Sequence, residues 1–195
     1  MDIHIHGPEA DRAERAAVDS VLDLRGIESS RPQRDLLLPA LRAVQMRFGW
    51  LRAGALNHIC RRLTLAPAEV FGVATFYHLF SLTPRPPDLI HICDDIACRT
   101  KGAERLCREL ENAVGPEDGG GPEAIFAWKR SPCLGQCERA PAVLVSRAGE
   151  DPQIFAQAPV ASAAEIISAL DGGKGEDVES LRSSVPQAGQ PQLRL

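Results

Sequence analysis

Two pairs of closely spaced cysteines constrain this chain more than any other feature. Cys93 and Cys98 are separated by four residues, and Cys133 and Cys137 by three. If the fold brings the pairs together, they form a cage of four thiolates, which are soft donors that select zinc, copper(I) or iron–sulfur clusters over hard cations. The fold must then place two loops that are far apart in the sequence next to each other.

The bulk composition indicates a globular protein without nucleic-acid or membrane chemistry. The chain has 195 residues, is 44% hydrophobic and carries a net charge of −4, whereas a nucleic-acid surface would be basic. It has no apolar run of about 18 residues, so we expect no direct membrane insertion. Its first residues do not form a secretory signal, which predicts a cytoplasmic protein. Thiols stay reduced there, so clustered cysteines indicate metal or redox chemistry rather than disulfides.

The apolar pattern changes from helical to strand-like along the chain. Apolar residues at helical spacing predict helices over 10–24, from Arg31-Pro32 to 48, around 56–63, and over 64–79, where Pro67 suits the first turn. The prolines of 83–87 end this region. Short β-branched or apolar runs then predict strands at 89–93, 125–129 and 142–146, with helices at 102–114 and 162–170. This order resembles that of thioredoxin.

The predicted fold class is α+β, with an N-terminal helical bundle followed by a thioredoxin-like α/β domain. The chain divides into four expected parts. They are an N-terminal extension (1–30), the helical bundle (31–82), the thioredoxin-like domain (88–172) and a polar tail without fixed structure (173–195).

The six cysteines separate into two groups. Cys60 and Cys107 lie on the apolar stripes of predicted helices, and we expect both to be packed in the core as small hydrophobic side chains. The other four lie where strands give way to loops, which is where functional groups concentrate. Gly135, inside the second pair, frees the backbone to fold around an inorganic core and to point N–H groups at sulfur.

Three chemistries compete for the four thiols. A disulfide oxidoreductase would use Cys-x-x-Cys, which neither pair provides. Structural zinc sites accept these spacings but usually belong to small domains that need the metal to fold. Plant-type [2Fe-2S] ferredoxins share the four-residue gap of the first pair. The spacing therefore favours a cluster and leaves zinc, or a structural or redox role of the thiols, open.

Longer motifs add a family resemblance. Leu37–Gln45 with Phe48-Gly49, Pro67–Val70 with Gly72–Tyr77, and the two cysteine loops together resemble the thioredoxin-like [2Fe-2S] subunit of bacterial NADH:quinone oxidoreductase (complex I). The resemblance implies one [2Fe-2S] cluster held by Cys93, Cys98, Cys133 and Cys137. It implies an oxidoreductase subunit in electron transport, with no catalytic residue of its own.

The resemblance also implies partners. FMN and NADH are expected on a flavoprotein NADH-binding subunit, beside further iron–sulfur subunits, because this chain has no nucleotide-binding fingerprint. The complex would lie in the cytoplasm or peripherally on the inner face of the cell membrane. Subunits of NAD-reducing hydrogenase and NAD-dependent formate dehydrogenase remain alternatives. A zinc-stabilised interaction module and a thiol-redox sensor are alternatives from other classes.

Several charged and aromatic residues carry further expectations. Asp94 and Asp95 lie inside the first cysteine loop, so their negative charge predicts a low reduction potential. Arg130 is expected to be solvated or to pair with an acidic partner surface. The aromatic run Thr75–Tyr77 is expected at an interface with the flavoprotein. His4 and His6 are expected to be solvated rather than to bind metal.

Overall fold

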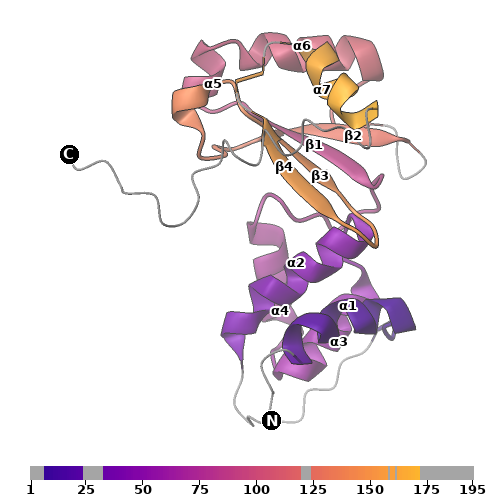
Figure 1. Ribbon diagram of the computed structural model, residues 1–195. Coiled ribbons are helices and arrows are strands. Elements are labelled where there is room, and N and C mark those ends of the chain that lie inside the picture. The colour runs from indigo at the N-terminus through magenta and orange to yellow at the C-terminus, as the bar shows by residue number, and fades with distance from the viewer. Residues whose placement is uncertain (1–6, 24–32, 120–123, 158, 161, 172–195) are drawn as a thin grey trace, which may run out of the picture. The chain divides into compact units, whose positions relative to one another are not determined.

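The computed structural model describes residues 7–23, 33–119, 124–157, 159–160 and 162–171 (Figure 1). His4, His6, the predicted helix start at Arg31-Pro32 and the 173–195 tail lie outside these residues. The chain forms two compact units. One consists mainly of the residues up to Leu89, and the other mainly of 90–120, 127–146 and the residues from 154 onward.

The described part of the first unit contains four α-helices, the number that the sequence predicts, although the second begins at Leu37 rather than at Arg31-Pro32. They are α1 (Arg12–Leu22), α2 (Leu37–Phe48), α3 (Ala53–Leu63) and α4 (Pro67–Phe76), with a 3₁₀ turn, η2 (Arg34–Leu36), before α2. A capping box of Asp11 and Glu14 starts α1. Gly49, at φ 79°, ends α2 in the left-handed region that favours glycine. Helix α4 ends three residues before the predicted Leu79, because Tyr77 is already extended.

The apolar faces of these helices form the core of the first unit. Cys60 belongs to it and is only 2% exposed, which confirms its predicted packing role. The fully buried side chains of this core include Val18, Leu22, Ala40, Leu41, Val44, Ala55 and Ile59. The described helices include none that is long and apolar enough to cross a membrane.

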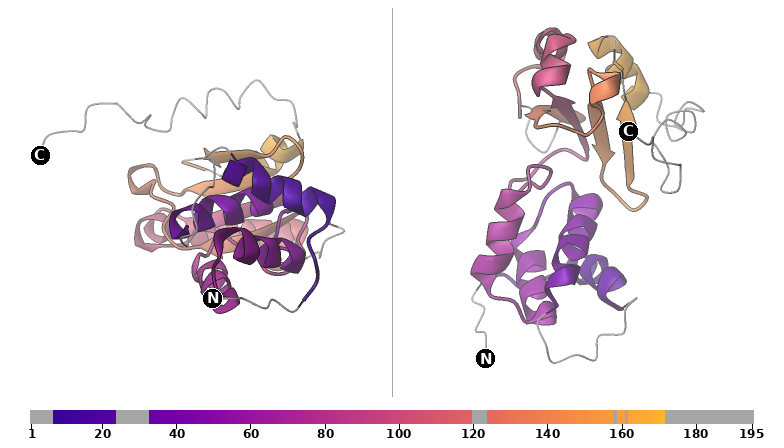
Figure 2. Two further views of the ribbon diagram at one scale, coloured as in Figure 1. Left: turned by 90° about the horizontal axis from the view of Figure 1, so that it is seen from below. Right: turned by 90° about the vertical axis from the view of Figure 1, so that its left-hand side faces the viewer.

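The rest of the chain builds a four-stranded sheet with helices. The elements are β1 (Asp88–Cys93), α5 (Ile96–Thr100), α6 (Ala103–Val114), β2 (Phe126–Ser131), a 3₁₀ turn η3 (Cys137–Arg139), β3 (Val143–Arg147), β4 (Gln153–Gln157) and α7 (Ala163–Asp171). The strand order is β2-β1-β3-β4. Figures 1 and 2 show α6 and α7 side by side, and Glu109 of α6 accepts a hydrogen bond from the first N–H of α7 at 3.0 Å.

Three of these elements are absent from the sequence prediction: α5, β4 and the short turn η3. Helix α5 has only five residues, which is too short for a helical apolar period to be visible. Strand β4 completes the sheet beside β3 at its edge, where Pro152 and Pro159 flank it. An edge strand is paired on one side only, so its sequence is less constrained than that of the central β1.

Hydrogen bonds at the strand ends give the strand directions. The N–H of Asp94, just after β1, donates to the carbonyl of Ser131 at the end of β2 at 3.1 Å. The N–H of Cys93 donates to the carbonyl of Ala142, just before β3, at 3.0 Å. Strands β1 and β2 therefore run parallel, and β3 runs antiparallel to β1. The C-terminal ends of β1 and β2 therefore lie next to the N-terminal end of β3. We call this end of the strands the cysteine edge of the sheet, because the cysteine loops begin there.

Candidate metal centre

Both cysteine pairs lie at this edge of the sheet. Cys93 is the last residue of β1 and Cys98 lies in α5, while Cys133 follows β2 by two residues and Cys137 begins η3. Because β1 and β2 are parallel neighbours, their exits carry the two loops to the same place. The topology thus brings together the two loops that the spacing of the cysteines required.

The first pair is buried in a small apolar cluster. Cys93 and Cys98 are 1% and 2% exposed and pack with Ala103 and Ala142. Leu134, which lies between the cysteines of the second pair, packs against the same cluster. The second cysteine loop therefore contacts the surroundings of the first pair directly.

The second pair is exposed and folded around a glycine. The Sγ atoms of Cys133 and Cys137 are 3.3 Å apart. Gly135 has φ 78°, and its N–H donates to Cys133 Sγ at 3.4 Å. The prediction that Gly135 turns the backbone and points an N–H at sulfur is confirmed. Such hydrogen bonds stabilise negative charge on sulfur in iron–sulfur proteins.

The thiols influence one another across the two loops. The pKa of Cys98 is raised to about 11, chiefly by burial; a backbone hydrogen bond from Ala142 opposes the rise, and Cys93 and Cys137 contribute to it. The pKa of Cys137 is raised chiefly by its hydrogen bond with Cys133. Four thiolates this close repel each other unless positive charge lies between them. Iron or zinc would supply that charge, so the donor set fits a thiolate-bound metal centre.

The four sulfur atoms are arranged as two pairs. A tetrahedral zinc site would need all four thiolates around one ion. A cluster with two irons needs one pair of thiolates for each iron, and the buried and exposed pairs match that requirement.

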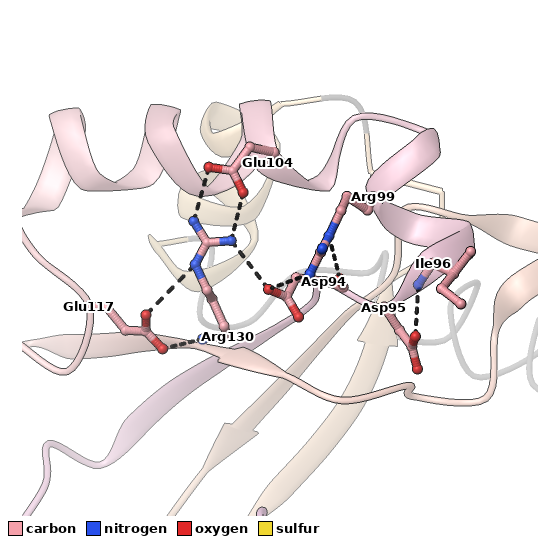
Figure 3. A network of polar contacts seen from close by, with 7 residues as sticks. All are labelled: Asp94, Asp95, Ile96, Arg99, Glu104, Glu117 and Arg130. Atoms are coloured by element: carbon pink, nitrogen blue, oxygen red, sulfur yellow. Dashed lines mark hydrogen bonds and ion pairs between the residues drawn. The ribbon is translucent and has the colours of Figure 1, made fainter.

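The carboxylates of the first loop are not free negative charges. Asp94 lies 3.6 Å from the guanidinium of Arg99 and 3.3 Å from that of Arg130 (Figure 3). Asp95 accepts a hydrogen bond from the N–H of Ile96 at 2.7 Å and caps α5. The predicted low reduction potential assumed uncompensated negative charge on these carboxylates. Two arginines compensate the charge of Asp94, so this assumption does not hold for it. The prediction that Arg130 is solvated is wrong, since it pairs with carboxylates of this chain.

Cys107 takes no part in this arrangement. It lies in α6, is fully buried, and packs in the interior as the sequence predicts. Burial raises the pKa of its thiol to about 11, which keeps it protonated near neutral pH. Cys60 and Cys107 are therefore separate from the four thiols at the sheet edge.

The chain matches several proteins of one kind. It is 33% identical over 115 residues to NADH-quinone oxidoreductase subunit 2 of Thermus thermophilus, covering 58% of this chain and 64% of that protein. It is 32% identical over 120 residues to an E-type NADH-quinone oxidoreductase subunit of Rhizobium meliloti, covering 61% and 70%. The chain thus spans less than two thirds of the Thermus relative.

A solved structure shares the fold. A chain of an NAD⁺-reducing [NiFe]-hydrogenase in the air-oxidized state superposes with a TM-score of 0.53 at 24% identity. The match covers 80% of this chain and 24% of the hydrogenase chain. At this identity the likeness concerns the fold alone.

The sequence profile of one family extends over most of the chain. The profile described as thioredoxin-like [2Fe-2S] ferredoxin matches residues 25–171, which include all of the α-helices except α1, the whole sheet and both cysteine loops. This agrees with the α+β fold and with a donor set of two thiol pairs. The chain belongs to the thioredoxin-like [2Fe-2S] ferredoxin family.

Proposed function

We propose that this chain is an electron-transfer subunit of an NADH-oxidising complex of the NADH:quinone oxidoreductase type. The observation that carries the proposal is the meeting of Cys93, Cys98, Cys133 and Cys137 at one sheet edge in a member of a [2Fe-2S] family. The Thermus and Rhizobium relatives, both NADH-quinone oxidoreductase subunits, support this choice of complex.

The four cysteines are the proposed cluster ligands, with Cys93 and Cys98 on one iron and Cys133 and Cys137 on the other. The bound cluster supplies a site that accepts and releases one electron at a time. The buried pair excludes water from one side of the site. The exposed pair leaves the other side at the surface, where an electron can enter or leave without crossing the protein interior.

The proposed partners are a flavoprotein that binds FMN and NADH and further iron–sulfur subunits of the same complex. Exposed aromatic side chains in the first unit support a contact surface. Phe76 and Tyr77 lie at the end of α4, and their side chains are 80% and 42% exposed. Their rings pack edge to face against each other. The proposed location is the cytoplasm, with the complex on the inner face of the cell membrane. A hydrogenase or formate dehydrogenase complex is the alternative setting.

The experiment is anaerobic purification of the tagged full chain, followed by iron, zinc and acid-labile sulfide analysis and EPR after dithionite reduction. We expect two irons and two sulfides per chain and a rhombic EPR signal from the reduced cluster. Serine substitution of each of the four proposed ligands should remove or alter the signal, whereas Cys60→Ser and Cys107→Ser, as matched controls, should keep it. One zinc per chain without sulfide would refute the proposal.

Proteins that co-purify with the tag identify the complex. We expect a flavoprotein with quinone-reductase subunits. Hydrogenase or formate dehydrogenase subunits in their place would refute the choice of complex while leaving the cluster intact.

A further inference from the structure

We propose that Arg130 is a positioning residue that fastens the two cysteine loops to each other and makes reduction of the cluster more favourable. The inference rests on the proposed function, because it concerns the cluster that these loops would hold. It is carried by a network of ion pairs that crosses from β2 to the loop after β1, to α6 and to the loop after α6 (Figure 3).

Arg130 lies where it can connect the loops. It is near the end of β2, three residues ahead of Cys133, and its guanidinium Nη1 lies 3.3 Å from Oδ2 of Asp94. Asp94 directly follows Cys93. One side chain therefore joins the segment that leads into the exposed thiol pair to the residue that follows the first buried thiol.

The guanidinium is itself held in place from two further directions. Glu104 of α6 accepts hydrogen bonds from Nη1 at 2.8 Å and from Nη2 at 3.2 Å. Glu117 accepts from the Arg130 backbone N–H at 2.8 Å and lies 3.7 Å from Nε. A planar guanidinium bound to a carboxylate through two parallel hydrogen bonds has a defined orientation, which a lysine ammonium cannot reproduce. The link between the loops is therefore geometric as well as electrostatic.

The charge of Arg130 matters because reduction adds an electron beside it. A cluster of two ferric ions, two sulfides and four thiolates carries −2 and becomes −3 on reduction. Without Arg130, the ion-pair partner left to Asp94 among the described residues is Arg99, which lies at 3.6 Å on a side chain that is 66% exposed. Exposed ion pairs are strongly screened, so Arg99 replaces little of the lost compensation.

Removing the charge should lower the reduction potential. We expect Arg130→Met to make the equilibrium constant for reduction about tenfold smaller, the effect of a unit charge about 12 Å away at an effective dielectric constant of about 20. For a one-electron couple, a tenfold change is a shift of about 59 mV. The double variant Asp94→Asn with Arg130→Met removes a negative and a positive charge together and should recover most of the shift.

The test is an EPR-monitored redox titration of the cluster-loaded full chain, combined with the rate at which a chelator removes iron. Arg130→Lys should keep a potential near that of the unmodified protein but lose iron faster, because lysine keeps the charge without the bidentate geometry. Arg34→Met is the matched control: Arg34 makes a similar two-pronged pair with Glu69 in the first unit, and its loss should change neither readout.

The outcomes separate the inference from the proposed function. If the unmodified chain binds no cluster, the proposed function fails. If it binds one and Arg130→Met leaves both the potential and the iron-loss rate unchanged, only the inference is overturned. If Arg130→Met does not load a cluster, Asp94→Asn decides the charge effect: removal of the carboxylate with Arg130 in place should raise the potential, and an unchanged or lower potential overturns the inference.

Discussion

Ionisation of Cys107 should couple the stability of the protein to pH in the alkaline range. This thiol is fully buried in α6. Burial raises its pKa from 9.0 to about 11, Arg130 opposes the rise, and the carboxylates of Glu104, Asp94 and Glu117 add to it. The folded protein therefore holds the Cys107 proton more tightly than the unfolded chain does.

The sign and size of the effect follow from this difference. Because the pKa is raised on folding, the stabilisation is fully present below pH 9 and is lost as the pH rises toward 11. The difference between the two pKa values corresponds to about 2–3 kcal/mol of the free energy of unfolding.

The assay compares the unmodified chain with Cys107→Ala by anaerobic urea unfolding between pH 8 and pH 11. The variant loses some packing and should be less stable at pH 8 by about 1 kcal/mol. As the pH rises, the unmodified chain should lose about 2–3 kcal/mol more than the variant, so that the two stability curves cross. All other titrating groups are common to both proteins. Parallel curves over this range would refute the reasoning.

Two further predictions concern the second cysteine loop and the aromatic surface. Gly135→Ala forces a side chain into the left-handed region at φ 78°, which costs about 1–2 kcal/mol, so we expect faster iron loss to a chelator; an unchanged rate would contradict this. Phe76→Ser removes an 80% exposed ring, so we expect loss of co-purifying flavoprotein with an unchanged EPR signal. Leu38→Ser, a less exposed position, is its control, and equal losses would contradict the assignment of this surface.

The sequence was sufficient for the helices of the first unit and for the kind of chemistry. The apolar period of α2 and the glycine that ends it are local features, and so is the proline in the first turn of α4. Local hydrogen bonding and the helical repeat determine these, so they can be found without the fold. The four thiols likewise showed a preference for soft metals from their type and spacing alone.

Short or weakly patterned elements could not be predicted from the sequence. Helix α5 is a single turn whose strongest signal is its capping residue, Asp95, which in the sequence alone is indistinguishable from a loop carboxylate. Strand β4 depends on pairing with β3, and such pairing is a contact between segments rather than a property of one segment.

Only the tertiary structure decided how the site is arranged. The sequence placed all four thiols where strands give way to loops, but only the parallel pairing of β1 with β2 brings the two pairs to one end of the sheet, and only the fold shows one pair buried and the other exposed. It also determines the partners of Arg130, whose Glu104 and Glu117 lie on segments that precede it by 26 and 13 residues. Charge compensation depends on the distances between charged side chains in the folded protein, and the sequence alone does not give those distances.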